Sequence, residues 1–140
     1  MSPESKKFIH DLPHSQTLYI AGHTIHVTHY GIAEDGQYAD IEPGNLSEMF
    51  KDIDADIIFH GHDHRVYEVH GGSWYINAGS LGYPGGDRNI ARAGMLYIDE
   101  DGFSFENMRI EYDIAKTLQD IEEFNFPNKE FIKKVFYGTQ

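Results

Sequence analysis

The chain has 140 residues, with 23 acidic side chains against 11 basic ones, which gives a formal charge of −12 at pH 7. This charge excludes non-specific binding to nucleic acid or to an anionic membrane surface, because both need clustered lysine and arginine. No apolar run approaches the ~20 residues of a membrane span, and no secretory signal is visible, so we expect a cytoplasmic protein. The length and an apolar content of 40% suit a single domain over residues 1–140.

The ligand chemistry open to this chain is limited by its composition. Cysteine is absent, which excludes disulfides, thiolate nucleophiles and cysteine-bound metals. Histidine, aspartate, glutamate and asparagine remain as metal ligands. Nine residues are histidine, and six of these fall in the short segments 23–29 and 60–64. These two segments are therefore the first place to look for function.

The N-terminal segment predicts a helix followed by a hairpin. Ser2 as N-cap and Pro3 at the first helical position predict a helix over residues 3–11. Two runs rich in β-branched and aromatic residues, 17–21 and 24–29, are separated by a glycine and predict two paired strands.

The next segment predicts a loop, a helix and a buried strand. Residues 31–44 are polar and acidic without a sustained period, which predicts a long loop. Asn45 with a glutamate three residues later predicts a capped helix over 45–52. The short apolar run 56–60 is typical of a strand that is buried on both faces.

The rest of the chain predicts two more hairpins and two terminal helices, with a glycine-rich loop at residues 78–86 between the hairpins. Alternating apolar residues and glycine turns indicate the strands, and a proline separates the helices. The predicted strands are 65–70, 73–77, 93–98 and 103–112, and the predicted helices are 113–124 and 128–137.

Two histidines directly follow the predicted buried strand. His62 and His64 flank Asp63, so their imidazoles can turn toward one metal or two neighbouring metals. The alternative is a pair of solvated histidines in a turn. Gly61 favours the metal site, because glycine permits close backbone approach or a positive φ. His29 ends a separate predicted strand, whereas His23, His26 and His60 are interpreted as lining or surface residues.

A glycine-rich loop follows a further predicted strand. Asn77, Gly79 and Ser80 begin this loop, whose backbone N–H groups are candidates for cradling an anion such as phosphate. Strand-end residues on neighbouring strands gather at one edge of a sheet, where open α/β sheets bind ligands. We therefore expect these residues near His29 and the histidine pair.

The order of these motifs resembles the calcineurin-like metallophosphoesterases, in their small bacterial branch. The resemblance is carried by residues 28–31 (Thr-His-Tyr-Gly), 57–64 (Ile-Ile-Phe-His-Gly-His-Asp-His) and 75–82 (Tyr-Ile-Asn-Ala-Gly-Ser-Leu-Gly), and it covers residues 4–138. It implies a mixed fold, α+β or α/β: the C-terminal half of a four-layer αββα sandwich, with β-hairpins and two C-terminal helices.

The resemblance also implies a site and a reaction. His29 and His62 would be ligands of one divalent metal and His64 of a second, with Mn, Fe, Zn or Ni as the metals. In this family a hydroxide that bridges the two metals attacks the phosphorus of a phosphate monoester or diester. A metal pair lowers the pKa of the bridging water and neutralises charge in the transition state.

The chain lacks three motifs that the family carries in its N-terminal half. Asp-x-His, Gly-Asp-x-x-Asp and Gly-Asn-His are absent, and with them the bridging carboxylate. We therefore expect the C-terminal half of a metallophosphoesterase that holds one metal tightly at most and has little activity alone. Whether the isolated chain is an enzyme stays open. Exposed strand edges predict a homo-oligomer or pairing with a missing N-terminal half.

Two other interpretations remain. His62, His64 and Glu68 fit the His-x-His-x-x-x-Glu pattern of the cupins, which hold one iron or manganese in a jelly roll. Alternatively, the chain is a non-catalytic half-domain that acts in oligomerisation or regulation.

Overall fold

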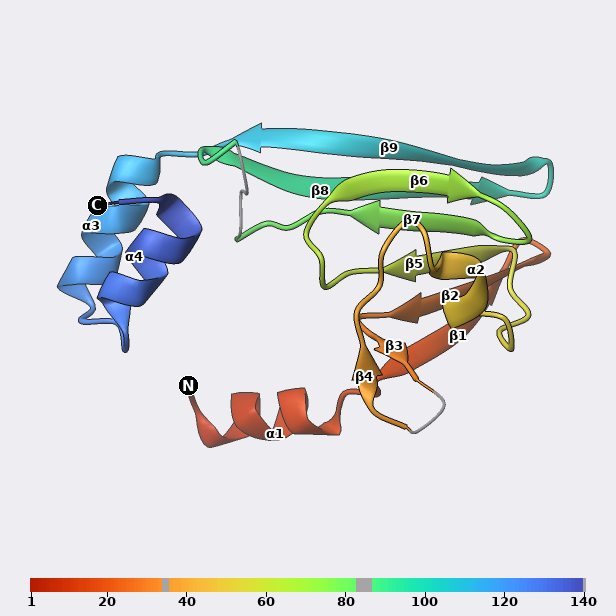
Figure 1. Ribbon diagram of the computed structural model, residues 1–140, viewed down its shortest axis with the longest axis horizontal. Coiled ribbons are helices and arrows are strands. Elements are labelled where there is room, and N and C mark those ends of the chain that lie inside the picture. Colours follow the sequence, from red (N-terminus) through yellow and green to blue (C-terminus); the bar gives the residue numbers. More distant parts are fainter. Residues whose placement is uncertain (34–35, 83–86, 140) are drawn as a thin grey trace.

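The centre of the molecule is a mixed five-stranded sheet with the strand order β1-β2-β5-β7-β6 (Figure 1). The computed structural model describes residues 1–33, 36–82 and 87–139. Strands β2, β5 and β7 run parallel, while β1 and β6 pair antiparallel at the two edges. The strands are β1 (Ser15–Ile20), β2 (His23–Thr28), β5 (Ile57–His60), β6 (Val66–His70) and β7 (Trp74–Ala78).

Two of the three inner strands, β5 and β7, are apolar because both of their faces are covered. Every residue of β5 is buried or nearly so, and four of the five residues of β7 are buried. Successive side chains of a strand point to opposite faces, so Ile57 and Ile58 belong to different clusters. The predicted strand at 56–60, buried on both faces, is confirmed.

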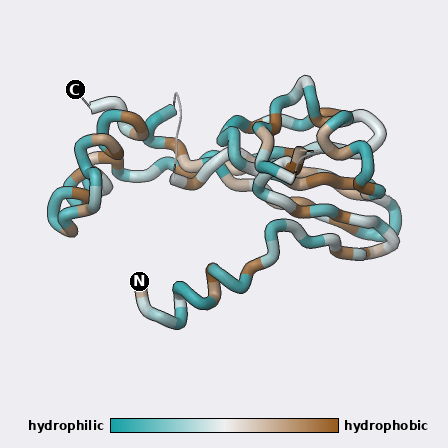
Figure 2. Tube along the Cα trace, turned by 60° about the horizontal axis from the view of Figure 1, so that its bottom comes forward, coloured by the Kyte–Doolittle hydropathy of each residue, from teal (hydrophilic) through white to brown (hydrophobic). Residues whose placement is uncertain are grey.

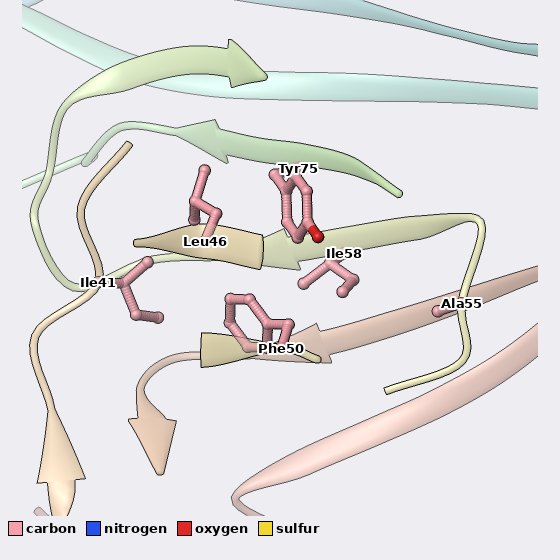
Figure 3. Close-up of a cluster of buried hydrophobic side chains, with 6 residues drawn as sticks. All are labelled: Ile41, Leu46, Phe50, Ala55, Ile58 and Tyr75. Carbon is pink, nitrogen blue, oxygen red and sulfur yellow. The ribbon is translucent and has the colours of Figure 1, made fainter. Parts of the chain in front are cut away.

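One face of the sheet packs against the short helix α2 (Leu46–Met49) and the segments around it. Phe50 lies close to Ile58 and Tyr75, and the rings of Phe50 and Tyr75 have centroids 6.1 Å apart (Figure 3). This cluster covers the face of the sheet over which residues 41–55 run. Its buried members are Ile41, Leu46, Phe50, Ala55, Ile58 and Tyr75.

The other face is covered by the hairpin of β8 (Ile90–Asp99) and β9 (Gly102–Glu111). Phe103 stacks on Trp74 with ring centroids 5.2 Å apart, and Phe105 packs against the same cluster. Gly94 permits this packing, since a Cβ there would lie 2.2 Å from Cε2 of Phe105. The buried members on this face are Ile25, Ile57, Trp74 and Ile76.

Three further helices lie toward the ends of the chain: α1 (Pro3–Asp11), α3 (Ile114–Glu123) and α4 (Lys129–Tyr137). Ser2 caps α1 by accepting a hydrogen bond from the Ser5 N–H, as predicted. Helices α3 and α4 lie beyond the end of the β8–β9 hairpin, away from the sheet (Figures 1 and 2). Within the described residues, no helix has the length and apolar character needed to cross a membrane.

Two local predictions were wrong in detail. The predicted loop 31–44 contains a small ladder of β3 (Gly31–Ile32) and β4 (Tyr38–Ala39). The predicted helix 45–52 ends early, at Met49, and the Asn45 side chain bonds the preceding turn. Its Oδ1 accepts from the Glu42 N–H and its amide donates to the Asp40 carbonyl, so it does not cap the helix.

The larger prediction is confirmed: the fold is mixed α/β, with β-hairpins and two C-terminal helices. The parallel pairing of β2 with β5 and of β5 with β7 also shows that the cupin interpretation was wrong, because a jelly roll is built from antiparallel strands. Glu68, its third expected ligand, is exposed on β6.

Candidate functional site

The carboxyl ends of three parallel strands meet at one edge of the sheet. His29 follows the end of β2, residues 61–64 follow β5, and Ala78 ends β7. The ladder pairs His60 with Asn77, which brings the last two strand ends side by side. Open α/β sheets bind ligands at such an edge, so the fold places the predicted segments where a site is expected.

Two of the predicted ligands lie next to each other. The rings of His29 and His62 have centroids 5.7 Å apart and are nearly perpendicular, at 81°. Tyr30 packs against both rings, at 4.7 Å from His29 and 4.4 Å from His62. The Nε2 atom of His62 lies 3.3 Å from Oδ1 of Asp40. His62 therefore has the imidazole of His29 on one side and the Asp40 carboxylate at its Nε2 atom.

Gly61 is required by the close approach of His29. A Cβ at position 61 would lie 2.9 Å from Nδ1 of His29, so a larger residue would displace that ring. Positive φ occurs instead at His62 (76°) and His64 (60°). A left-handed conformation costs a non-glycine residue about 1 to 3 kcal/mol, so the surrounding structure must hold both histidines in place.

The surroundings of His29 favour its neutral form. Burial lowers the pKa of His29, and the nearby His62 and His64 lower this pKa further because positive charges repel. His64 is half-buried and lies close enough to His29 to act on it in this way. Neutral imidazole is the form that binds metals, so His29 is ready to bind at neutral pH.

Asn77 connects the end of β7 to the histidine turn. Its side chain is fully buried, and its amide group donates to the Asp63 carboxylate and to the Gly61 carbonyl at 3.5 Å. Its Oδ1 accepts from the Gly79 N–H at 2.9 Å. The Ser80 hydroxyl accepts from the Gly82 N–H, and the loop's residues 83–86 lie outside the described residues. The role of Asn77, Gly79 and Ser80 toward phosphate stays a prediction.

The donor chemistry fits a divalent transition metal, for which imidazole is a common ligand. His29 and His62 offer two such donors side by side. Within residues 1–33, 36–82 and 87–139, however, no group of three or more His, Asp or Glu side chains is close enough to hold a metal. The described residues thus fit a metal in ligand type and fall short of a complete site in number.

A cavity of about 280 Å³ lies beside His29. The linker from α1 to β1 forms one wall, and the aromatic rings of the β3–β4 region form the other. This volume is close to the lower end of the range for small-molecule sites, roughly 300 to 1,000 Å³. Its lining residues include Leu12, His14, Thr28, His29, Tyr30 and Tyr38.

Two other histidines are buried, which corrects their interpretation as lining or surface residues. His60 is 3% exposed and lies between Phe50 and Tyr67, with ring centroids 6.1 and 5.4 Å away. His26 is 8% exposed, and its Nδ1 lies 3.0 Å from the Thr17 hydroxyl. Burial lowers the pKa of each of these histidines.

Sequence reasoning missed three residues of this region. Asp40 is one of several acids in a segment without periodicity, so nothing in the sequence distinguishes it. Asp63 had a signal, its place between two histidines, but its contacts depend on the fold. Tyr67 on β6 lies beside the His60 ring, and burial and then the Asp63 carboxylate raise the pKa of its hydroxyl to about 12.

Comparison with known proteins identifies the family of this chain. The family model of the calcineurin-like phosphoesterase superfamily domain matches residues 2–101. An uncharacterized protein of Methanocaldococcus jannaschii, MJ0912, is 26% identical to this chain and matches 89% of it. The structure of hypothetical protein PH1004 from Pyrococcus horikoshii aligns with 98% of the chain at a TM-score of 0.72 and 18% identity. A metallophosphoesterase from Sphaerobacter thermophilus aligns with 91% at a TM-score of 0.63 and 22% identity.

These matches cover only part of each relative. The chain spans 56% of the Methanocaldococcus protein, 55% of the Pyrococcus chain and 58% of the Sphaerobacter chain. The family model itself covers residues 2–101, which include all three strand ends of the site. This chain belongs to the calcineurin-like phosphoesterase superfamily.

Proposed function

We propose that this chain contributes the histidine-rich part of a metal-dependent phosphoesterase site, which hydrolyses phosphate monoesters or diesters. One observation carries the proposal: the imidazoles of His29 and His62 lie 5.7 Å apart at the carboxyl edge of the parallel strands. Superfamily membership supports the reaction class. The preference of transition metals such as Mn, Fe, Zn or Ni for imidazole supports the ligand assignment.

Each residue of the site has a distinct part in this proposal. His29 and His62 hold the metal, and His64 is the candidate ligand of a second one. When bound, such a metal polarises phosphate oxygens and lowers the pKa of a coordinated water. Gly61 leaves room for the His29 ring, and Asp40 offers a carboxylate oxygen beside His62.

The surroundings of the site suit a phosphate ester. The cavity beside His29 has room for a small ester group, and Tyr30 and Tyr38 line one of its walls. The chain carries a net charge of −12, which repels an anionic substrate, and a bound cation reverses the field locally. We propose that carboxylate donors from outside the described residues complete the metal site.

Calorimetric titration of the chain with Zn²⁺ and Mn²⁺ tests the ligand assignment. We expect one metal to bind, and His62→Ala to weaken binding at least tenfold, because it removes one of two adjacent donors. His70→Ala is the matched control, since His70 pairs with Trp74 at the opposite edge of the sheet. Binding that is unchanged in the His62 variant would contradict the proposal.

Hydrolysis of bis(p-nitrophenyl) phosphate with added Mn²⁺ tests the reaction. We expect hydrolysis to be slow, because the described metal donors are incomplete. His62→Ala should abolish this hydrolysis, and His70→Ala should preserve it. Hydrolysis at rates typical of ordinary enzymes would show that the chain completes the metal site by itself. Hydrolysis that survives loss of His62 would contradict the proposed site.

A non-catalytic role is the second candidate function. It is favoured by the finding that no three potential ligands converge within the described residues. In that case the chain would act through association with a second copy or another protein. Metal binding at His62 without any metal-dependent hydrolysis would favour this candidate.

A further inference from the structure

The turn that carries the two histidines is held from within by Asp63. Its Oδ1 accepts hydrogen bonds from the Arg65 N–H, at 3.1 Å, and from the amide of Asn77. Its Oδ2 accepts from the Arg65 guanidinium, at 3.0 Å from Nε and 2.9 Å from Nη2. The Asp63 side chain is only 12% exposed. Both carboxylate oxygens are therefore occupied by donors from the protein.

This carboxylate sits between two strained residues. His62 and His64, its neighbours on either side, both have positive φ. Neither is a glycine, so their conformation persists only where other contacts hold it. The hydrogen bonds of Asp63 to the backbone and side chain of Arg65 fix the turn immediately after His64.

Asn77 anchors the same turn to the core. It is fully buried at the end of β7, where its Oδ1 accepts from the Gly79 N–H and its amide donates to Asp63. The position of Asp63 is thereby tied to a strand that is covered on both faces. A chain of hydrogen bonds runs from the core strand through Asn77 and Asp63 to the histidine turn.

We propose that Asp63 is a positioning residue, which sets the orientation of His62 and His64 and is not itself a metal ligand. This inference rests on the proposed function, because it concerns the same two histidines. The middle residue of the His-Asp-His segment then bonds other groups of the protein and not the metal. From its place between two histidines alone, this aspartate would be expected to be a third metal ligand.

The test uses the full chain and three variants. Asp63→Ala removes both carboxylate acceptors. Asp63→Asn keeps an Oδ1 acceptor and loses the charge that faces Arg65. The control is Asp54→Ala, at an exposed acidic residue. Two quantities are measured: the Zn²⁺ affinity by calorimetry, and the imidazole nitrogen signals of His62 and His64 by NMR in the metal-free protein. The signals of His26 serve as an internal reference.

We expect Asp63→Ala to weaken Zn²⁺ binding roughly 10- to 100-fold, as is typical for residues that orient metal ligands. The ring signals of His62 and His64 shift in the metal-free variant, while those of His26 do not. Asp63→Asn has a smaller effect on both quantities, and Asp54→Ala has none. If Asp63→Ala fails to fold, Arg65→Ala removes the guanidinium donors alone and gives the same pattern at reduced size.

Two results would overturn the inference. The first is Zn²⁺ affinity within twofold of wild type in Asp63→Ala. The second is weakened binding with unchanged ring signals in the metal-free variant, which would make Asp63 a ligand. If the wild-type chain binds no Zn²⁺, the proposed function fails by itself, and the metal-free ring signals still decide whether Asp63 positions the histidines.

Discussion

The central sheet and the terminal helices of this molecule differ in how they are stabilised. Strands β5 and β7 are buried on both faces, whereas α1 and α4 have no buried residue and α3 has one, Ile121. Helices α3 and α4 are joined by ion pairs instead: Lys129 and Lys133 hydrogen-bond Glu122 and lower the pKa of its carboxyl to about 2. Exposed ion pairs add little stability, so the sheet dominates the free energy of unfolding.

The predicted metal ligands belong to the sheet region and not to the helices. The predicted ligands directly follow β2 and β5, two inner strands of the sheet. The apolar side chains of the helices, such as Phe8 in α1 and Phe131 in α4, are exposed. The substitutions below measure how far the two regions differ.

The largest effect is expected at Ile58, which is fully buried between α2 and the sheet. Ile58→Ala removes methyl groups and leaves a cavity, so it should lower the free energy of unfolding by about 2 to 5 kcal/mol. Urea denaturation followed by circular dichroism measures this. The control Ile9→Ala, on the exposed face of α1, should change stability by less than about 0.5 kcal/mol. Equal losses in both variants would show that α1 is packed as firmly as the sheet.

A smaller loss in the free energy of unfolding is expected in the hairpin of β8 and β9. Gly94→Ala places a Cβ 2.2 Å from the Phe105 ring, which must move. Overpacking of this kind costs about 1 to 3 kcal/mol. Gly72→Ala is the matched control, because a Cβ there meets no atom within 4 Å and its φ is not positive. If both variants melt at the same temperature, the Phe105 ring does not lie against Gly94 as described.

Acid should destabilise the sheet before it affects the helices. Burial lowers the pKa of His26 and of His60, so the folded state binds fewer protons than the unfolded state below about pH 6.5. Stability therefore falls as the pH drops from 7 to 5. Denaturation at several pH values measures this slope, and His26→Gln should reduce it. A slope that is unaltered in this variant would mean that His26 is protonated as readily when folded as when unfolded.

The smallest effect on folding is expected on the helices. Phe131→Ser in α4 replaces an exposed ring, so the free energy of unfolding should change by no more than about 0.5 kcal/mol. If such rings mediate the self-association that the sequence predicts, light scattering will show a lower mass for the variant than for wild type. A stability loss of several kcal/mol would instead mean that the ring is buried in a partner or in a larger fold.

Regular elements followed from local patterns. Strand β5 was predicted over residues 56–60, because a short apolar run between turns suits a strand covered on both faces. The cap of α1 was predicted because the Ser2 hydroxyl needs only its own helix as a partner. The predicted cap of α2 was wrong, because the Asn45 side chain bonds the preceding turn, a choice that no spacing rule reveals.

The sequence by itself determined which residue types are present for chemistry and which strand ends carry them: His29, then His62 and His64, then Asn77. These follow from local periodicity and motif order, which are properties of short segments. Only the tertiary structure decided what they meet. It set His29 against Gly61, brought Asp40 to His62 and occupied Asp63 with Asn77 and Arg65. The physical reason is that these contacts depend on strand register and loop paths, which are set by packing across the whole sheet.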